Sequence, residues 1–410
     1  MAALDVYFFD EKIGVLTQKE GKTNLSFKYL ETATKAISLS LPLKNESYGD
    51  RETRGFFESL LPEGDIRKAI AKYEGVSENN PFALLRKIGG ECAGAISLYE
   101  EGKKPVYGEE RKILKYGDIQ KKLKASKIPL AILLDNIRFS LAGAQDKIVI
   151  TYLDGKVYFP SVSLPSNYII KPENQYFENV IYNENYCMTL CRRVIGTAAV
   201  SGVYCVDIPF YIVQRYDRKT VGDNVFRLHQ EDFCQVLSLY NKKYQKEGGP
   251  SLKTCYNLII EHSSEPLMDG LRFLCVIIFN FIIGNSDAHG KNFSFLYEDE
   301  KISLAPFYDI LSTQLYEKTD KDLSMSIGGE YDPDKIFLSH FIKMAKELGI
   351  KQDLVVKTIS AIIDNILEQR VSLIEELKTE ENNSFDLIID KINELMDKRI
   401  NQLKISPDEK

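Results

Sequence analysis

Histidine is scarce in this chain, and the motifs that would mark several large enzyme classes are missing. Only four of the 410 residues are histidine and no H-E-x-x-H motif occurs, so catalytic zinc is not expected. The absence of G-x-S-x-G leaves an α/β-hydrolase without support. The nucleotide-binding patterns G-x-x-x-x-G-K-[ST] and G-x-G-x-x-G are absent too, so any phosphate-binding loop must be of another type.

The chain also has no excess of basic residues. It carries 53 Lys and Arg against 59 Asp and Glu, a net charge of −6, so bulk attraction to nucleic acid is not expected. No stretch of about 18 apolar residues suggests a membrane-spanning helix, and the N-terminus lacks the pattern of a signal peptide. The seven cysteines form no C-x-x-C pair. Reduced thiols in a cytoplasmic globular protein therefore fit best.

The most informative motif that is present places Asp287 and Asn292 five positions apart, with Asp309 seventeen residues further on in Phe-Tyr-Asp. In protein kinases, one aspartate accepts the proton of the attacking hydroxyl, and an asparagine five residues later and a further aspartate bind Mg²⁺. Mg²⁺ takes oxygen ligands, so these residue types suit the chemistry. By itself, a D-x-x-x-x-N spacing is more often a solvated loop that matches by chance.

The setting of this motif strengthens the kinase interpretation. Residues 273–283 form an apolar run, too short to cross a bilayer and interrupted by Asn280, which indicates a buried helix. Gly284 and Asn285 are a suitable stop signal. The polar loop would therefore emerge from the core on a rigid element, as a catalytic loop should.

The strand and helix patterns predict an α+β protein with two parts. In the first part we expect an antiparallel meander, another extended piece, a helix and a further strand, at residues 6–9, 13–16, 25–29, 38–43, 82–88 and 95–99. A charged segment at residues 100–115, with two glycines and a proline, suggests the domain boundary. At 410 residues, two domains or lobes are expected.

The second part begins with predicted strands and continues as helices. The strands are expected at residues 147–152, 156–159, 168–171, 203–206 and 209–213, with a helix at 183–194. From residue 230 the pattern is mostly helical, and apolar residues at helical spacing predict helices around 355–367 and 385–395. A strand-rich lobe followed by a helical lobe is the order found in kinases.

Three further segments are candidates for nucleotide binding. Lys171 ends a predicted strand, where a kinase lysine pairs with phosphate oxygens, and Glu184 on the next helix is its candidate partner; the alternative is a solvated strand-edge lysine. The small residues of the loop at 140–147, together with Lys147, are suited to covering phosphates, although the pattern is weak. Residues 214–218 follow a strand where a kinase hinge would lie, with Tyr216 as an apolar surface for adenine; a plain surface turn is the alternative.

In chain order, these segments resemble the HipA family of bacterial serine/threonine kinase toxins. The resemblance is carried by residues 56–64 (F-F-E-S-L-L-P-E-G) and 88–95 (I-G-G-E-C-A-G-A), then by 140–147 (S-L-A-G-A-Q-D-K), 169–171, 183–184, 215–218, 229–233, 284–294 (G-N-S-D-A-H-G-K-N-F-S) and 305–309 (A-P-F-Y-D). It covers nearly the whole chain. It implies a kinase-like two-lobed fold with a β-rich N-terminal domain at 1–105, a linker at 106–125 and a kinase domain at 126–405. Within that domain the strand-rich lobe would span 126–215 and the helical lobe 216–405.

The resemblance also implies roles for individual residues. Asp287 would be the proton acceptor, Asn292 and Asp309 would bind Mg²⁺, and Ser140 matches a serine that such kinases autophosphorylate. The implied nucleotide contacts are Ala142, Gly143, Ala144, Gln145, Asp146, Lys147, Lys171, Gln214, Arg215, Tyr216, His289, Asn292, Tyr308 and Asp309. Two departures occur at the hinge: Gln214 stands where some members have Glu, and Tyr216 replaces the commoner Phe.

The implied function is an ATP- and Mg²⁺-dependent kinase that acts as the toxin of a type II toxin–antitoxin pair in the cytoplasm. Its substrate would be an aminoacyl-tRNA synthetase, glutamyl-tRNA synthetase foremost. Its partner would be a small HipB-like helix-turn-helix antitoxin that carries the DNA contacts, with no membrane involved. Two alternatives stay open: a catalytically silent kinase fold that serves as co-repressor, and a kinase of small molecules.

Overall fold

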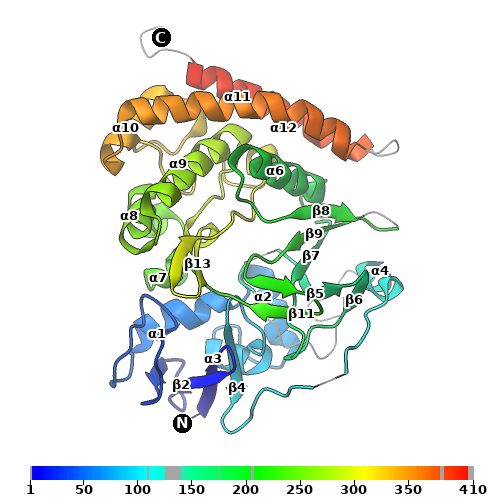
Figure 1. Ribbon diagram of the computed structural model, residues 1–410, viewed down its shortest axis with the longest axis vertical. Helices are drawn as coiled ribbons and strands as arrows, with labels where there is room; N and C mark the ends of the chain where they lie inside the picture. Colours follow the sequence, from blue (N-terminus) through cyan, green and yellow to red (C-terminus); the bar gives the residue numbers. More distant parts are fainter. Residues whose placement is uncertain are drawn as a thin grey trace.

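The computed structural model describes residues 2–108, 110–124, 140–143, 145–174, 176–204, 207–378 and 383–404. One predicted nucleotide-binding residue, Ala144, lies outside these ranges, as does the predicted start of the kinase domain at 126–139. Figure 1 shows the β-rich N-terminal part at one end of the molecule and the long C-terminal helices at the other, with the remaining strands between them.

The N-terminal part is an antiparallel sheet in the order β3-β2-β1-β4, formed by β1 (Ala2–Phe8), β2 (Glu11–Gln18), β3 (Leu25–Tyr29) and β4 (Ile96–Glu100). The predicted meander and final strand are therefore confirmed. Its core also takes up α1 (Asp50–Phe57), η1 (Glu58–Leu60), α2 (Gly64–Tyr73) and the predicted α3 (Pro81–Ile88). The expected extended piece at 38–43 is wrong, because a bridge between Ser38 and Leu41 closes a turn there.

A five-stranded antiparallel sheet in the order β6-β5-β7-β9-β8 follows. Its strands are β5 (Ile148–Leu153), β6 (Lys156–Tyr158), β7 (Tyr168–Pro172), β8 (Ser201–Tyr204) and β9 (Phe210–Gln214), and the helix α6 (Val180–Ile195) packs against β8 and β9. These are the strands and the helix that the sequence predicts. Part of the predicted linker forms α4 (Tyr116–Lys124), whose Ile119 and Leu123 are buried with Ile148 and Val149. The domain borders themselves stay predictions.

Short strands also occur where mostly helix was expected. A hairpin of β10 (Arg218–Val221) and β11 (Asn224–Arg227) precedes a three-stranded sheet of β12 (His229–Asp232), β13 (Ser294–Glu298) and β14 (Lys301–Leu304). Segments of four or five residues are too short to show a clear alternation of apolar and polar positions. Figure 1 shows β13 close to the middle of the molecule.

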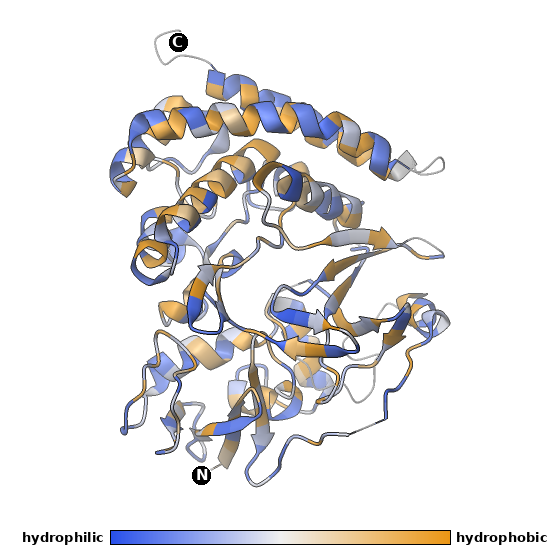
Figure 2. Cartoon of the chain, viewed as in Figure 1, coloured by the Kyte–Doolittle hydropathy of each residue, from blue (hydrophilic) through white to orange (hydrophobic). Residues whose placement is uncertain are grey.

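The helical lobe accounts for the rest of the fold. It consists of α7 (Phe233–Val236), η2 (Gln245–Glu247), α8 (Leu252–His262), α9 (Pro266–Ile283), η3 (Gly290–Asn292), η4 (Thr313–Leu315), η5 (Pro333–Lys335), α10 (Leu338–Leu348), α11 (Gln352–Leu377) and α12 (Asn383–Lys404). The two C-terminal helices confirm the periodicity seen in the sequence. In Figure 2 they carry apolar and polar residues in alternation along their length, as expected of helices with one buried face.

The helix α9 supports the loop that follows it. It has 18 residues with a mean hydropathy of 1.8, enough by length and composition alone to cross a membrane, yet 67% of it is buried inside the protein. It packs against α8, α11, α12 and α6, as a core helix does. It ends at Gly284, whose φ of 73° favours glycine, and the N–H of Asn285 donates to the carbonyl of Asn280. The predicted buried helix and its stop are confirmed.

The N-terminal part is joined to the rest of the chain through buried polar contacts. The carboxylate of Glu231 on β12 accepts hydrogen bonds from the Ser38 hydroxyl at 2.5 Å and from the Leu39 N–H at 3.0 Å. The N–H of Gly94 donates to Asp217 Oδ2 at 2.7 Å. Because buried charges are stable only when paired or hydrogen-bonded, these contacts fix how the N-terminal part sits on the kinase-like part.

Candidate active site

The lysine at the centre of the five-stranded sheet has two carboxylate partners. Lys171 lies on β7, the middle strand, and its Nζ donates to Glu184 Oε1 at 2.7 Å and to Asp309 Oδ1 at 2.8 Å. Glu184 comes from α6, where its side chain is 2% exposed. The expected pair of Lys171 and Glu184 is therefore present. Lys171 is not a solvated strand-edge lysine.

Charge pairing keeps Lys171 and Asp309 ionised. Burial raises the pKa of Asp309, but the ammonium groups of Lys171 and Lys147 outweigh it and hold that pKa well below its usual range. Burial likewise lowers the pKa of Lys171, but Asp309 and Glu184 outweigh it and raise the value. Asp309 also has a φ of 58°, a left-handed conformation that costs about 1–3 kcal/mol for a residue other than glycine. Its ion pair with Lys171 helps to hold this strained backbone.

The loop after α9 presents the candidate base. The N–H of Asp287 donates to Asn285 Oδ1, and its carboxylate, half exposed to solvent, accepts a hydrogen bond of 2.9 Å from the Tyr244 hydroxyl. Partial removal of this carboxylate from water raises the pKa of Asp287 to about 6, against the opposing effects of Lys243 and Tyr244. A carboxylate with a pKa near neutrality is suited to accepting a proton.

The two predicted metal ligands lie on one small cavity. Asn292 on η3 and Asp309 both line it, together with Tyr308. In the described part of the chain no group of three or more His, Cys, Asp and Glu is placed to hold a metal ion. One ionised carboxylate and one amide oxygen fit Mg²⁺, which binds few protein ligands and completes its shell with water and substrate phosphates.

His289 stands within the same loop and is uncharged. Its ring is buried, and its Nδ1 has no hydrogen-bond partner among the described residues. Burial and then the neighbouring Lys243 lower its pKa to about 3. The ring meets Tyr244 edge-on at 5.3 Å, and the Nε2 atom lies 4.0 Å from Asp287 Oδ1. It is therefore a neutral neighbour of the base.

The predicted phosphate-covering segment is held by the N-terminal part. Ser140 is fully buried; its hydroxyl donates to the carbonyl of Leu60 at 2.7 Å and its N–H to the carbonyl of Glu91. Lys147 Nζ donates to the carbonyl of Ala142 at 2.6 Å, within the segment itself. Burial and then Lys171 lower the Lys147 pKa to about 8.

Glycine is required within this segment. Gly143 has a φ of 108°, a backbone conformation that residues with a side chain rarely adopt. Gln145 and Asp146 are half-buried and lead into β5. Lys147, the last residue of the segment, is near enough to Lys171 for the two charges to interact, which suits a phosphate-covering loop.

The predicted hinge is tied to the N-terminal part. The N–H groups of Gln214 and Arg215 donate to the carbonyls of Val200 and Asn167. The Arg215 guanidinium is buried and donates to Asp217 and to Ser166, with Glu91 of the N-terminal part 3.5 Å away. The side chain of Arg215 is therefore engaged elsewhere, and its predicted nucleotide contact is left to the backbone carbonyl.

Tyr216 and Tyr308 are brought together. Their rings stack with centroids 5.1 Å apart, so a base would lie over one face of this pair rather than between its members. The Tyr308 hydroxyl donates to the carbonyl of Lys291, while the Tyr216 hydroxyl donates to Gln230. The hinge and the Phe-Tyr-Asp segment thus meet through two predicted residues.

Four residues that the sequence did not single out also line the site. Tyr244 and Lys243 come from the segment between α7 and α8, Lys291 precedes Asn292, and Glu63 belongs to the N-terminal part. Lys291 lies in Gly-Lys-Asn directly before the predicted metal ligand Asn292, and this position could have identified it as a site residue from the sequence. Glu63 lies within residues 56–64, which carry the family resemblance, but nothing in that segment marks it as a site residue, and no catalytic motif marks Lys243 or Tyr244.

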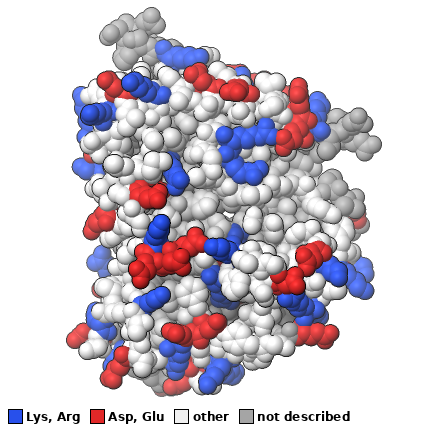
Figure 3. Space-filling model, in the orientation of Figure 1, with Lys and Arg blue, Asp and Glu red and all other residues white. Residues whose placement is uncertain are grey.

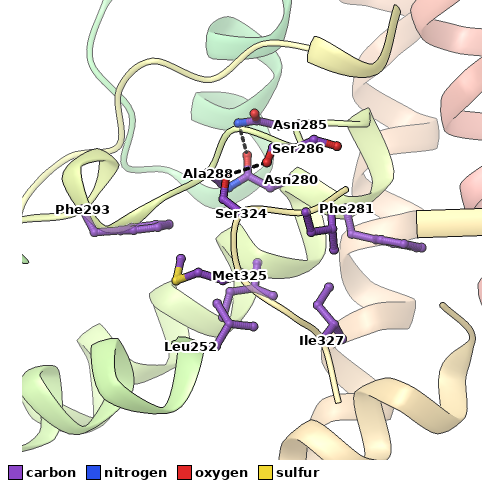
Figure 4. A pocket seen from close by; sticks show the side chains of 12 residues that line it. Leu252, Asn280, Phe281, Asn285, Ser286, Ala288, Phe293, Ser324, Met325 and Ile327 are labelled. Atoms are coloured by element: carbon purple, nitrogen blue, oxygen red, sulfur yellow. Dashed lines mark hydrogen bonds between the residues drawn. The ribbon is translucent and has the colours of Figure 1, made fainter. Parts of the chain in front are cut away.

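A second, small cavity lies beside the loop that follows α9. It is lined by twelve residues, among them Leu252, Phe281, Asn285 and Met325. Figure 4 shows these side chains converging from several segments, with Asn285 bonded to Asn280. Asp287, Lys171 and Asp309 do not line it, but it adjoins the candidate active site, because four of its lining residues also line the small cavity of Asn292 and Asp309: Asn280, Asn285, Ala288 and Phe293.

Surface charge around the molecule is mixed. Figure 3 shows acidic and basic side chains interspersed over the face in view, without a broad basic area. This agrees with the net charge of −6. A strongly basic surface for nucleic acid is not seen on this face.

The strand-rich lobe carries a lysine paired with a glutamate, the helical lobe carries the loop with Asp287 and Asn292, and Asp309 forms an ion pair with the same lysine. These features define a protein-kinase-like fold. Models of the HipA-like C-terminal domain and of the HipA N-terminal domain match residues 139–370 and 4–99. The chain belongs to the HipA family, and the predicted fold class, α+β with two kinase-like lobes and a β-rich N-terminal domain, is confirmed.

Several known proteins are similar to this chain along most of its length. Y4mE of Sinorhizobium fredii, provisionally named a kinase, is 35% identical and covers 98% of both chains. The serine/threonine-protein kinase toxin HipA of Shewanella oneidensis is 28% identical, over 80% of this chain and 79% of its own. A solved complex of the toxin–antitoxin proteins HipA and HipB of Shewanella oneidensis with operator DNA contains a chain that matches with a TM-score of 0.85 and 24% identity, over 98% of this chain and 97% of that one.

Proposed function

We propose that this protein is an ATP- and Mg²⁺-dependent serine/threonine protein kinase. The observation that carries the proposal is the geometry of Lys171, which binds Glu184 and Asp309 at once while Asp287 stands on the neighbouring loop. A phosphoryl-transfer site needs a cation for the phosphates, carboxylate and amide oxygens for the metal and a base for the acceptor hydroxyl. All of these groups are present.

The residues can be assigned to one reaction. Asp287 accepts the proton of the acceptor hydroxyl. The hydroxyl oxygen bonds to the γ-phosphorus as the bond between that phosphorus and the leaving ADP oxygen breaks. Lys171 and Lys147 hold phosphate oxygens, and the backbone of residues 142–147 covers them. Asn292 and Asp309 would hold Mg²⁺, which neutralises charge on the phosphates when bound. Gln214 to Tyr216, Tyr308 and His289 are proposed to surround the base and sugar.

We further propose that the kinase is a cytoplasmic toxin of a type II pair, with a HipB-like antitoxin as its partner and DNA contacted only through that antitoxin. The support is the Shewanella oneidensis complex of HipA, HipB and operator DNA, together with the acidic charge of this chain. The proposed substrate is an aminoacyl-tRNA synthetase, such as glutamyl-tRNA synthetase, and Ser140 is the proposed site of autophosphorylation.

The deciding experiment is transfer of label from γ-labelled ATP by the purified protein, beside Asp287→Asn. We expect wild type to label a synthetase and itself, and Asp287→Asn to be slower by about 10²–10⁴-fold with unchanged thermal unfolding. Absence of any transfer by folded wild type would favour a silent co-repressor. Label recovered only in a metabolite would favour a small-molecule kinase.

A further inference from the structure

One carboxylate of the N-terminal part reaches the catalytic loop. Glu63, the residue before α2, accepts from Lys291 Nζ on Oε1 at 2.6 Å and from Lys243 Nζ on Oε2 at 2.9 Å. The side chains of all three residues are mostly buried. A single glutamate therefore joins two lysines from segments about fifty residues apart in the chain.

Both lysines adjoin groups assigned to the reaction. Lys291 directly precedes Asn292, and Lys243 directly precedes Tyr244, whose hydroxyl donates to Asp287. The carbonyl of Lys243 also accepts a hydrogen bond from an N–H in the catalytic loop, that of Gly290. The Glu63 carboxylate is thus bonded to the segment whose Tyr244 contacts the candidate base Asp287, and to the loop that carries the candidate metal ligand Asn292.

The backbone at the same place holds the phosphate-covering segment. The N–H of Glu63 donates to the carbonyl of Gly143 at 3.0 Å, and Pro62 and Gly143 form a parallel bridge. Leu60 accepts the hydroxyl of Ser140. Residues 60–63 therefore contact both the predicted phosphate-covering segment and the catalytic loop.

The charge of Glu63 is needed for this arrangement. Burial raises its pKa, but Lys291 and Lys243 outweigh burial and lower it to about 2, so the carboxylate is ionised. Lys243 already acts electrostatically on Asp287, and without Glu63 as its partner the Lys243 ammonium group would be drawn toward that carboxylate. A lysine paired with Asp287 would oppose proton acceptance.

We propose that Glu63 is a positioning residue of the active site, contributed by the N-terminal domain. It holds Lys243 and Lys291 away from the catalytic carboxylates and fixes the phosphate-covering segment relative to the catalytic loop. The kinase domain alone therefore lacks one member of its own active site. This inference rests on the proposed kinase function.

The test compares Glu63→Gln with Asp65→Asn, a matched control two residues away whose exposed carboxylate pairs only with Lys68 among the described residues. We expect Glu63→Gln to lower kcat by about 10- to 100-fold with KM for ATP within about twofold of wild type, because misplacement acts on the chemical step. Asp65→Asn should behave as wild type. In a background carrying Lys243→Met and Lys291→Met, the further effect of Glu63→Gln should largely vanish.

Unchanged kcat in Glu63→Gln, a loss confined to KM, or an equal loss without the two lysines would overturn the inference. The wild-type protein tests the proposed function in the same assay. If wild type transfers no phosphate, the proposed kinase function is wrong, and that result by itself does not decide the role of Glu63. Hydrogen exchange then decides the inference independently of activity. We expect faster exchange at residues 140–143 and 285–292 in Glu63→Gln than in Asp65→Asn, and equal exchange would overturn it.

Discussion

The hydroxyl of Tyr244 donates a hydrogen bond of 2.9 Å to Asp287 Oδ1. The two residues are 43 positions apart, and Tyr244 approaches from the segment between α7 and α8 rather than from the catalytic loop. The bond restricts rotation of the carboxylate, and Oδ2 is then the oxygen available to an acceptor hydroxyl. Tyr244 thus orients the candidate base and stabilises its ionised form.

The pH dependence of the reaction should depend on this contact. The pKa of Asp287 is raised to about 6, and only its ionised form accepts a proton, so kcat should fall as pH decreases through about 6. The Tyr244 hydrogen bond lowers that pKa, so Tyr244→Phe should move the acidic limb to higher pH by about one unit. Profiles of kcat between pH 5 and 8 would measure it. The exposed Tyr204→Phe is the control, and identical limbs in all three proteins would contradict the prediction.

Lys171→Met should destabilise the fold as well as abolish activity. It leaves Glu184, which is 2% exposed, without its counter-charge, and breaking a buried pair in this way costs about 3 kcal/mol. Urea denaturation would measure the loss in the free energy of unfolding. Lys219→Met, which removes an exposed lysine paired with Glu298, should produce no measurable change. Equal stability of the two variants would refute the structural role of the pair.

Asp309→Asn should raise the Mg²⁺ concentration needed for half-maximal activity by about tenfold or more, since loss of even a residue that only hydrogen-bonds a metal ligand lowers metal affinity about 10- to 100-fold. A Mg²⁺ titration at saturating ATP measures it, and EDTA should abolish transfer by wild type. Asp299→Asn is a close control, because Asp299 also has a positive φ, 55° against 58°, and asparagine tolerates that conformation. A similar shift in both variants would assign the effect to the backbone instead.

Phosphorylation of Ser140 should displace its segment. The hydroxyl is buried and donates to the carbonyl of Leu60. A carbonyl oxygen cannot donate a hydrogen bond to a phosphate dianion and would repel it. After incubation with ATP we expect mass spectrometry to find phosphate on Ser140 and residues 140–143 to exchange faster with deuterium. Ser140→Ala should show neither change and lose about 1 kcal/mol of stability with its hydrogen bond. A phosphorylated Ser140 in a segment that stays protected would contradict this prediction.

The parts of the fold that sequence patterns predicted share a physical basis. The meander and the five-stranded sheet have apolar residues at regular spacing, and burial of one face follows from that spacing. The helix α9 was predicted from a continuous apolar run, which is buried on nearly all sides. The helices α1 and α2 and the strands β12 to β14 were missed because they are short or only partly apolar. The turn closed by Ser38 and Leu41 was mistaken for a strand because apolar and polar residues alternate there by chance.

The sequence by itself determined which chemistry is available: Asp287 and Asn292 lie within one loop, and their spacing is set by local covalent structure. Lys171 and Asp309 were suggested by their places after a strand and in a Phe-Tyr-Asp segment, but only the tertiary structure joined them. Only the tertiary structure shows that Glu63 contacts Lys243 and Lys291, and that Tyr244 contacts Asp287. Contacts between distant segments are decided by how cores pack, and no local spacing records that packing.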